Sequence, residues 1–156
     1  MTKHLTNKDF LHVIDVTPLV SIDLVIRNEN GQALLGYRNN RPAQHYWFVP
    51  GGRVRKNERI TAAFQRLCQT ELRLDLSLEK ARFLGVYEHL YADNFIGKSG
   101  ITTHYVVLGY ELRLQSSKNV ELDDQHSQQR WWSEAELLSS SKVHANTKAY
   151  FDDVFC

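Results

Sequence analysis

Residues 51–74 read GGRVRKNERITAAFQRLCQTELRL, and this stretch decides the fold. It begins with Gly51 and Gly52 after a short aromatic segment, a pattern that predicts a strand ending in a glycine loop. From residue 57 to residue 74, apolar residues recur every three or four positions, which predicts an amphipathic helix. The apolar face of this helix consists of Ile60, Ala63, Phe64, Leu67, Cys68 and Leu72. The stretch therefore predicts a glycine loop that leads into a helix packed against a sheet.

The rest of the chain predicts strands on both sides of this helix and further helices at the two ends. Strands are predicted at residues 19–27, 32–37, 46–49, 81–91, 101–114 and 130–132. Helices are predicted at residues 5–14, 133–138 and 146–155. Thr6 or Asn7 is expected to cap the first of these helices and Ser133 the second. A turn containing Gly31 joins the first two strands into a hairpin. This order of elements predicts an α+β fold or a mixed α/β/α sandwich.

The length and composition are those of an ordinary globular protein. The 156 residues fit one domain spanning residues 1–156, and the formal net charge of +1 gives no sign of a nucleic-acid or membrane partner, so neither is expected. The N-terminus is too polar for a signal peptide, and no apolar run approaches the ~20 residues that a bilayer span needs. Cys68 and Cys156 are expected to be free thiols. These features together predict a cytoplasmic protein.

The spacing of charged residues after the glycines resembles the Nudix box. Five residues separate Gly52 from Glu58, seven separate Glu58 from Arg66, and Glu71 follows. In the Nudix family a strand, loop and helix present carboxylates and backbone carbonyls to Mg²⁺, which holds a diphosphate. Oxygen ligands are the ones that Mg²⁺ prefers. The resemblance implies a Nudix-type α/β/α sandwich with a mixed β-sheet.

Two carboxylates of the family pattern are missing from this helix. Leu67 and Thr70 stand where the family has glutamate, and Arg73 replaces a final glycine. Because several divalent ions close together need negative charge around them, we expect one Mg²⁺, held by Glu71 and neutral oxygens. Such an ion is better placed to stabilise a leaving group than to generate hydroxide. The box alone also leaves open a decayed domain that binds its ligand without catalysis.

Segments along nearly the whole chain resemble the GDP-mannose mannosyl hydrolases, a divergent Nudix branch. The segments are TPLVSIDLVI (17–26), NRPAQHYWFVPGGRV (40–54), AAFQRL (62–67), THYVVLGY (103–110), DDQH (123–126) and VHANTKAYF (143–151). That family cleaves the bond between the anomeric carbon of the sugar and the β-phosphate oxygen, with inversion, giving GDP and free sugar. The resemblance implies GDP-mannose as the substrate and GDP-glucose as a second one. It also implies a homodimer.

The same resemblance implies a metal site and a general base. At matching positions the Gly51 carbonyl, Glu71 and the side-chain oxygen of Gln125 would hold one Mg²⁺ per subunit. Mn²⁺ is expected to be able to substitute for Mg²⁺. His126 would remove a proton from the attacking water, and an ordinary histidine pKa of about 6.5 suits that task.

The leaving GDP gains negative charge as the bond breaks, and guanidinium groups can stabilise that charge. The residues implied for this work are Arg38, Arg53, Arg66 and Tyr105. The transition state is expected to be oxocarbenium-like. Arg66 could instead pair with Glu58 or Glu71 and orient the helix.

Two polar residues inside predicted strands are expected to contact the substrate. Asp23 stands among apolar residues, where a charge is costly unless it has a partner, and the resemblance implies a substrate-site aspartate there. His89 is a similar but weaker candidate. Two other functions stay open: an ordinary Nudix pyrophosphohydrolase that attacks phosphorus, and a non-catalytic nucleotide-sugar binding module.

Overall fold

The computed structural model describes residues 4–118, 120 and 128–152. Its centre is a seven-stranded mixed sheet, in which five strands follow the order β3-β2-β1-β6-β5 while β4 pairs with β1 and β7 with β2. The strands are β1 (Leu19–Arg27), β2 (Ala33–Tyr37), β3 (Trp47–Phe48), β4 (Gly51–Arg53), β5 (Arg82–Tyr91), β6 (Thr103–Arg113) and β7 (Gln129–Trp132). The helices are α1 (Asn7–Val16), α2 (Ile60–Leu72), the short 3-10 helix η1 (Leu78–Lys80), α3 (Glu134–Ser139) and α4 (Ala145–Lys148).

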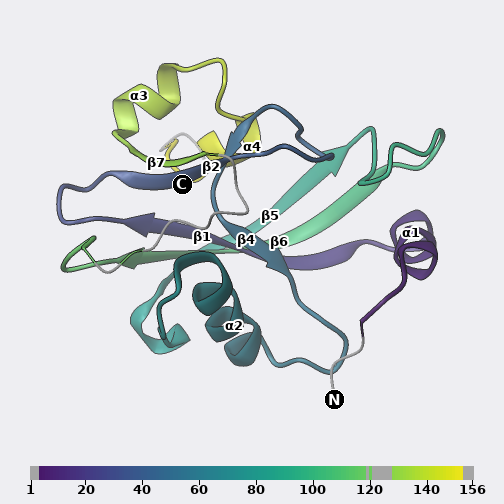
Figure 1. The fold of residues 1–156 in the computed structure, drawn as a ribbon, viewed down its shortest axis with the longest axis horizontal. Coiled ribbons are helices and arrows are strands. Elements are labelled where there is room, and N and C mark those ends of the chain that lie inside the picture. Colours follow the sequence, from purple (N-terminus) through teal and green to yellow (C-terminus); the bar gives the residue numbers. More distant parts are fainter. Residues whose placement is uncertain (1–3, 119, 121–127, 153–156) are drawn as a thin grey trace.

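The helices lie on both faces of the sheet, which confirms the predicted α/β/α sandwich with a mixed sheet. In Figure 1, α2 covers one face, α3 and α4 lie over the other, and α1 lies at one end. Thr6 caps α1 and Ser133 caps α3, as predicted. Within the described ranges, no helix combines the length and apolar character that a membrane span needs.

Strand β1 organises the sheet because it pairs along both sides. On one side it runs parallel to β6 over its full length. On the other side it pairs with β4 at residues 21–23 and with β2 at Arg27. The neighbour of β1 therefore changes from β4 to β2 between Asp23 and Arg27.

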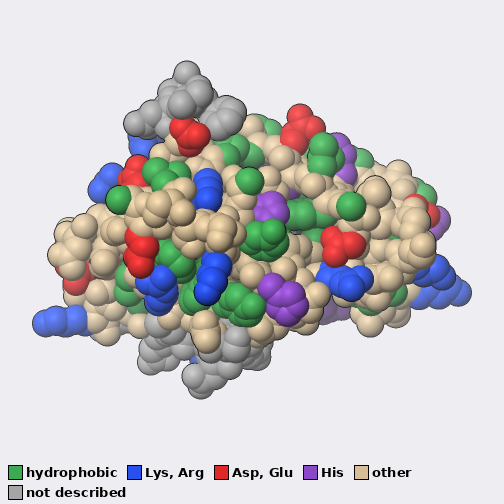
Figure 2. Space-filling model, turned by 90° about the horizontal axis from the view of Figure 1, so that it is seen from above, with side chains coloured by type: hydrophobic (Ala, Val, Ile, Leu, Met, Phe, Trp, Pro, Cys, Tyr) green, Lys and Arg blue, Asp and Glu red, His purple; other side chains and the backbone are tan. Residues whose placement is uncertain are grey.

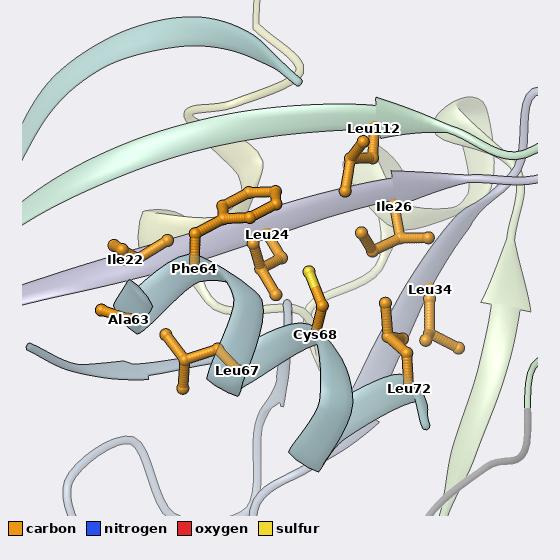
Figure 3. Close-up of a cluster of buried hydrophobic side chains, with 10 residues drawn as sticks. All are labelled: Ile22, Leu24, Ile26, Leu34, Ala63, Phe64, Leu67, Cys68, Leu72 and Leu112. Carbon is orange, nitrogen blue, oxygen red and sulfur yellow. The ribbon is translucent and has the colours of Figure 1, made fainter. Parts of the chain in front are cut away.

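Helix α2 packs on β1 through the apolar face that its periodicity predicted. Figure 3 shows Phe64, Cys68 and Leu72 among the aliphatic side chains of the sheet, and all three are fully buried. Ile60, the sixth predicted position, is 39% exposed because it lies at the first turn.

The predicted helix at residues 57–74 is longer than the observed one. Asn57 has a φ of 65° and Arg73 a φ of 58°, both in the left-handed region, so neither belongs to the helix. Arg73 takes the position after the last helical residue, where glycine is favoured because it has no Cβ to clash. This geometry accounts for the family glycine that Arg73 replaces.

The predicted glycine loop is wrong for residues 51–53, which form β4 and pair with β1. Glycines show no alternation of polar and apolar side chains, so a sequence pattern cannot reveal this strand. A side chain on Gly51 would collide with the Ile22 carbonyl oxygen and lie 2.7 Å from Oδ1 of Asp23. Only glycine lets the two strands approach this closely here.

The predicted C-terminal helix at residues 146–155 is longer than the observed one. Helix α4 has only four residues, and the chain then turns at residues 149–151, while residues 153–155 lie outside the described part. Tertiary hydrogen bonds hold this segment instead: Val49 N donates to Thr147 Oγ1 at 3.3 Å, and the Tyr150 hydroxyl donates to Asp23.

Candidate active site

A hollow with about 490 Å³ of empty space opens beside the first half of β1. Strand pairing places its floor, because Tyr105 on β6 lies beside Leu19 of β1 and opposite His89 of β5. Six predicted site residues line it, namely Asp23, Arg38, Gly51, Arg53, His89 and Tyr105. Residues far apart in the sequence thus meet around one hollow.

A second, smaller hollow adjoins the first. Glu71 lines it together with Gln129, whereas Gly51 and Arg38 line both hollows. The two predicted metal ligands within the described residues, Gly51 and Glu71, are therefore neighbours. Helix α2 supplies the carboxylate and β4 supplies the backbone.

Asp23 is buried at the floor of the first hollow, with 7% of its surface exposed. The Tyr150 hydroxyl donates a hydrogen bond to its Oδ2 at 2.6 Å, and Nδ1 of His89 lies 4.0 Å from the same oxygen. Burial raises the pKa of Asp23 to about 7, although the Tyr150 hydrogen bond and the charge of Arg38 act in the opposite direction. A carboxylate with such a pKa is typical of a functional site.

His89 lies next to Asp23 as a neutral side chain. Burial, and to a smaller extent His144, lowers the pKa of His89 to about 4. Its Nε2 atom is buried and has no hydrogen-bond partner within the described residues. Because buried polar atoms normally have partners, this nitrogen is well suited to a ligand hydroxyl.

Two arginines bring positive charge to the first hollow. Nε of Arg38 donates to the Pro42 carbonyl at 2.9 Å, and within the described residues its terminal nitrogens make no hydrogen bond. The Arg53 guanidinium lies 5.0 Å from the centre of the Phe10 ring. Burial lowers the pKa of Arg53 and raises that of Tyr105, so the phenol keeps its proton near neutral pH.

Arg66 pairs with Glu58, which is one of the two glutamates that the sequence left open as its partner. Its guanidinium donates to both Glu58 carboxylate oxygens, at 2.7 and 2.9 Å, and to the Arg53 carbonyl oxygen at 2.9 Å. Arg66 is absent from the residues that line the two hollows. It ties α2 to β4, and its predicted contact with the leaving group stays a prediction.

The two positions that lack family carboxylates serve structural purposes. Leu67 is buried and packs on Gly52, where an added Cβ would lie 2.6 Å from Leu67 Cδ2. The Thr70 hydroxyl donates to the Arg66 carbonyl at 2.8 Å. Across the described residues, no three His, Cys, Asp or Glu side chains form a group that could hold a metal ion. The predicted ligand set is of another kind, with one carboxylate and neutral oxygens.

Gln125 and His126 lie outside the described residues, so their predicted roles as metal ligand and base remain predictions. From residue 128 the chain runs beside the site: Gln129 lines the second hollow, and Tyr37 N donates to the Gln128 carbonyl at 2.9 Å.

Sequence reasoning missed two residues of the site, Tyr91 and Tyr150. Tyr91 lines the first hollow, and Tyr150 holds Asp23 from the far end of the chain. The resemblance of residues 143–151 was the one signal that this segment matters. Figure 2 shows histidine and hydrophobic side chains near the middle of one face of the molecule, with Lys and Arg side chains around them.

Known proteins share both sequence and fold with this chain. A model of the NUDIX domain matches residues 17–154. The Low-salt glycan biosynthesis protein Agl8 of Haloferax volcanii is 42% identical over 128 residues, which are 81% of this chain and 78% of that protein.

Solved structures with TM-scores above 0.6 show the same fold at low sequence identity. A MutT NUDIX hydrolase from Burkholderia pseudomallei has a TM-score of 0.69 at 24% identity, covering 88% of this chain and 98% of its own. A MutT protein from Methanosarcina mazei has a TM-score of 0.67 at 22% identity, covering 86% of this chain and 91% of its own. The family match, the Agl8 identity and these folds agree with the predicted Nudix family and fold. The chain belongs to the NUDIX domain family and has the fold of its hydrolases.

Proposed function

We propose that this protein hydrolyses GDP-mannose, with GDP-glucose as a second substrate, to GDP and the free sugar. The observation that carries the proposal is that the first hollow is lined both by guanidinium groups and by a carboxylate with a neutral imidazole. Arg38 and Arg53 offer guanidinium groups to a diphosphate, whereas Asp23 and His89 offer a carboxylate and a neutral imidazole to sugar hydroxyls. Agl8 acts, by its name, in glycan biosynthesis, which fits a nucleotide-sugar substrate.

The bond that breaks is the one between the anomeric carbon and the β-phosphate oxygen. Leu67 packs on Gly52 and Thr70 bonds to helix backbone, so neither position offers the carboxylate that a cluster of several metal ions would need. This arrangement favours help to a leaving group over generation of a metal-held nucleophile beside phosphorus.

One Mg²⁺, or Mn²⁺ in its place, would be held by the Gly51 carbonyl, Glu71 and the side-chain oxygen of Gln125. The neighbourhood of Gly51 and Glu71 fits an ion that takes few carboxylates and shares its shell with phosphate. When bound, such an ion neutralises the diphosphate and makes GDP a better leaving group.

The chain itself supplies the remaining chemistry. Arg38 and Arg53 stabilise the charge that develops on GDP, and Tyr105, which keeps its proton, donates to the same oxygens. Arg66 assists by holding the Arg53 backbone. His126 accepts a proton from the water that attacks the anomeric carbon on the face opposite GDP, which inverts its configuration.

Product analysis separates this proposal from the two alternatives. The protein is incubated with GDP-mannose and Mg²⁺, and the products are separated by ion exchange. GDP and mannose support the proposal. GMP and mannose 1-phosphate would identify an ordinary pyrophosphohydrolase, and tight binding without turnover would identify a binding module.

A His126→Gln substitution tests the base. We expect its kcat to fall by about 10²–10⁴-fold, the usual contribution of a general base. Gln128→Ala, two residues away on the same segment, is the matched control and should keep most of the activity. Full activity in the His126 variant would contradict the assignment.

The predicted homodimer has a candidate surface on the sheet. Val86 and Leu90, at the edge strand β5, are 62% and 67% exposed, and Val20 of β1 is 44% exposed. Strand register places Val20 in the same row as Glu88, between these two residues. A second copy of the chain would cover these exposed apolar side chains.

A further inference from the structure

The ring of Tyr150 stands in a slot that the sheet leaves open beside Asp23. Gly109 on β6 is the residue paired with Asp23 in the parallel register. A Cβ on Gly109 would lie 2.9 Å from Cε1 of Tyr150 and 3.1 Å from Cε2 of Tyr87. The missing side chain at Gly109 thus makes room for Tyr150, whose ring packs edge-on against Tyr87 with centroids 4.6 Å apart.

This placement lets the Tyr150 hydroxyl reach the carboxylate of Asp23. Its hydrogen bond to Oδ2 is short, at 2.6 Å, as expected when the acceptor is charged. Within the described residues, Oδ1 of Asp23 makes no hydrogen bond and lies on the side of Gly51, which also lines the hollow. One carboxylate oxygen is therefore held, and the other is available to a ligand.

The segment that carries Tyr150 is fixed to the walls of the same hollow. His144 N donates to the Trp47 carbonyl at 3.2 Å, which attaches the segment to β3. Nδ2 of Asn146 donates to the hydroxyl of Tyr91 at 3.2 Å, and Tyr91 lines the hollow. Tyr150 thus approaches Asp23 from a segment that is itself anchored on two sides.

We propose that Tyr150 is a positioning residue for the proposed reaction: its hydroxyl fixes Asp23 so that the free Oδ1 accepts hydrogen bonds from the sugar. The inference rests on the proposed function, because it assigns Asp23 to the sugar rather than to GDP. A side chain held by a neighbouring hydrogen bond loses less freedom when the substrate binds, so the contact favours the oriented complex.

A double-mutant cycle distinguishes positioning from simple packing. Tyr150→Phe keeps the ring in its slot and removes only the hydroxyl, and Asp23→Ala removes the group on which the hydroxyl acts. kcat/KM for GDP-mannose is measured with Mg²⁺ for the wild type, both single variants and the double variant. Tyr110→Phe, which removes a hydroxyl from another β6 ring that packs edge-on against Phe64, is the matched control.

We expect Tyr150→Phe to lower kcat/KM about tenfold in the wild-type background, as removal of one hydrogen bond to a charged group does. In the Asp23→Ala background the same substitution should change kcat/KM less than twofold, because its target is gone. GDP lacks the mannose of the substrate, so calorimetry should give the same GDP affinity for Tyr150→Phe and wild type. Tyr110→Phe should leave kcat/KM within twofold.

Equal losses from Tyr150→Phe in both backgrounds, or a parallel loss of GDP affinity, would overturn the inference. Gly109→Ala provides a second test, since it displaces the ring but keeps the hydroxyl, and it should lower kcat/KM at least as much as Tyr150→Phe. If Gly109→Ala keeps the kcat/KM of the wild type, the inference is overturned. A wild-type protein that does not hydrolyse GDP-mannose would instead refute the proposed function, which is a separate result.

Discussion

Replacing Glu58 with glutamine should destabilise the junction between α2 and β4. The Glu58 carboxylate accepts two hydrogen bonds from Arg66, and only 6% of its side chain is exposed, against 25% for Arg66. The substitution leaves Arg66 charged without its partner, but water can still reach part of the guanidinium. We therefore expect a loss of about 2 kcal/mol in the free energy of unfolding, below the ~3–5 kcal/mol of a fully buried pair.

Thermal and urea denaturation at pH 7 measure this loss. For a chain of this size, about 2 kcal/mol corresponds to a fall in Tm of about 4–8 °C. Glu136→Gln is the control, because Glu136 pairs with Arg130 at 3.3 Å where both side chains are about half exposed. That pair should contribute less than about 1 kcal/mol.

The pH dependence gives an independent check. Arg66 holds the pKa of Glu58 below its ordinary value of 4.5, so the pair stabilises the folded protein above that value. The stabilisation is lost as the pH falls through the lowered pKa of the folded state, and wild type and Glu58→Gln should converge there. A difference below about 0.5 kcal/mol at pH 7, or one that persists unchanged at pH 3, would refute the reasoning.

Three further perturbations follow from the packing. Burial raises the pKa of Cys68 to about 12. In a Cys156→Ser variant, a thiol reagent should therefore react with Cys68 only after unfolding, and rapid labelling of the native protein would contradict its burial. Gly52→Ala should lower the free energy of unfolding by about 1–3 kcal/mol, because the added methyl group clashes with Leu67. Leu67→Ala in the same chain should remove the clash, and strictly additive losses of the two substitutions in denaturation would contradict this contact. Leu90→Lys should convert a dimer to a monomer in light scattering, and an unchanged dimer mass would exclude this surface.

The sequence predicted the elements whose signal is local. The periodicity of residues 57–74 identified α2 and its buried face, because a helix repeats its contacts every three or four residues. Strand β4 escaped because Gly51 and Gly52 carry no side chains to alternate. The helix predicted at residues 146–155 ends early, at Lys148, and the Tyr150 hydroxyl bonds to Asp23 from the turn that follows.

The site was predictable by resemblance and far less by local pattern. Asp23 stood out because a charge in the middle of an apolar strand needs a partner. Its partner Tyr150 is 127 residues away, a contact that no local pattern reveals. The sequence left both Glu58 and Glu71 open as partners of Arg66. Only the folded structure, which places Glu58 beside the Arg66 guanidinium, decides between them.

The fate of ¹⁸O from labelled water tests the central claim most directly. The protein is incubated with GDP-mannose and Mg²⁺ in ¹⁸O-water, and the products are weighed by mass spectrometry after a single turnover. Attack at the anomeric carbon predicts one ¹⁸O atom in the free sugar and unlabelled GDP. Label in a phosphate group of the product would show attack at phosphorus and contradict the account.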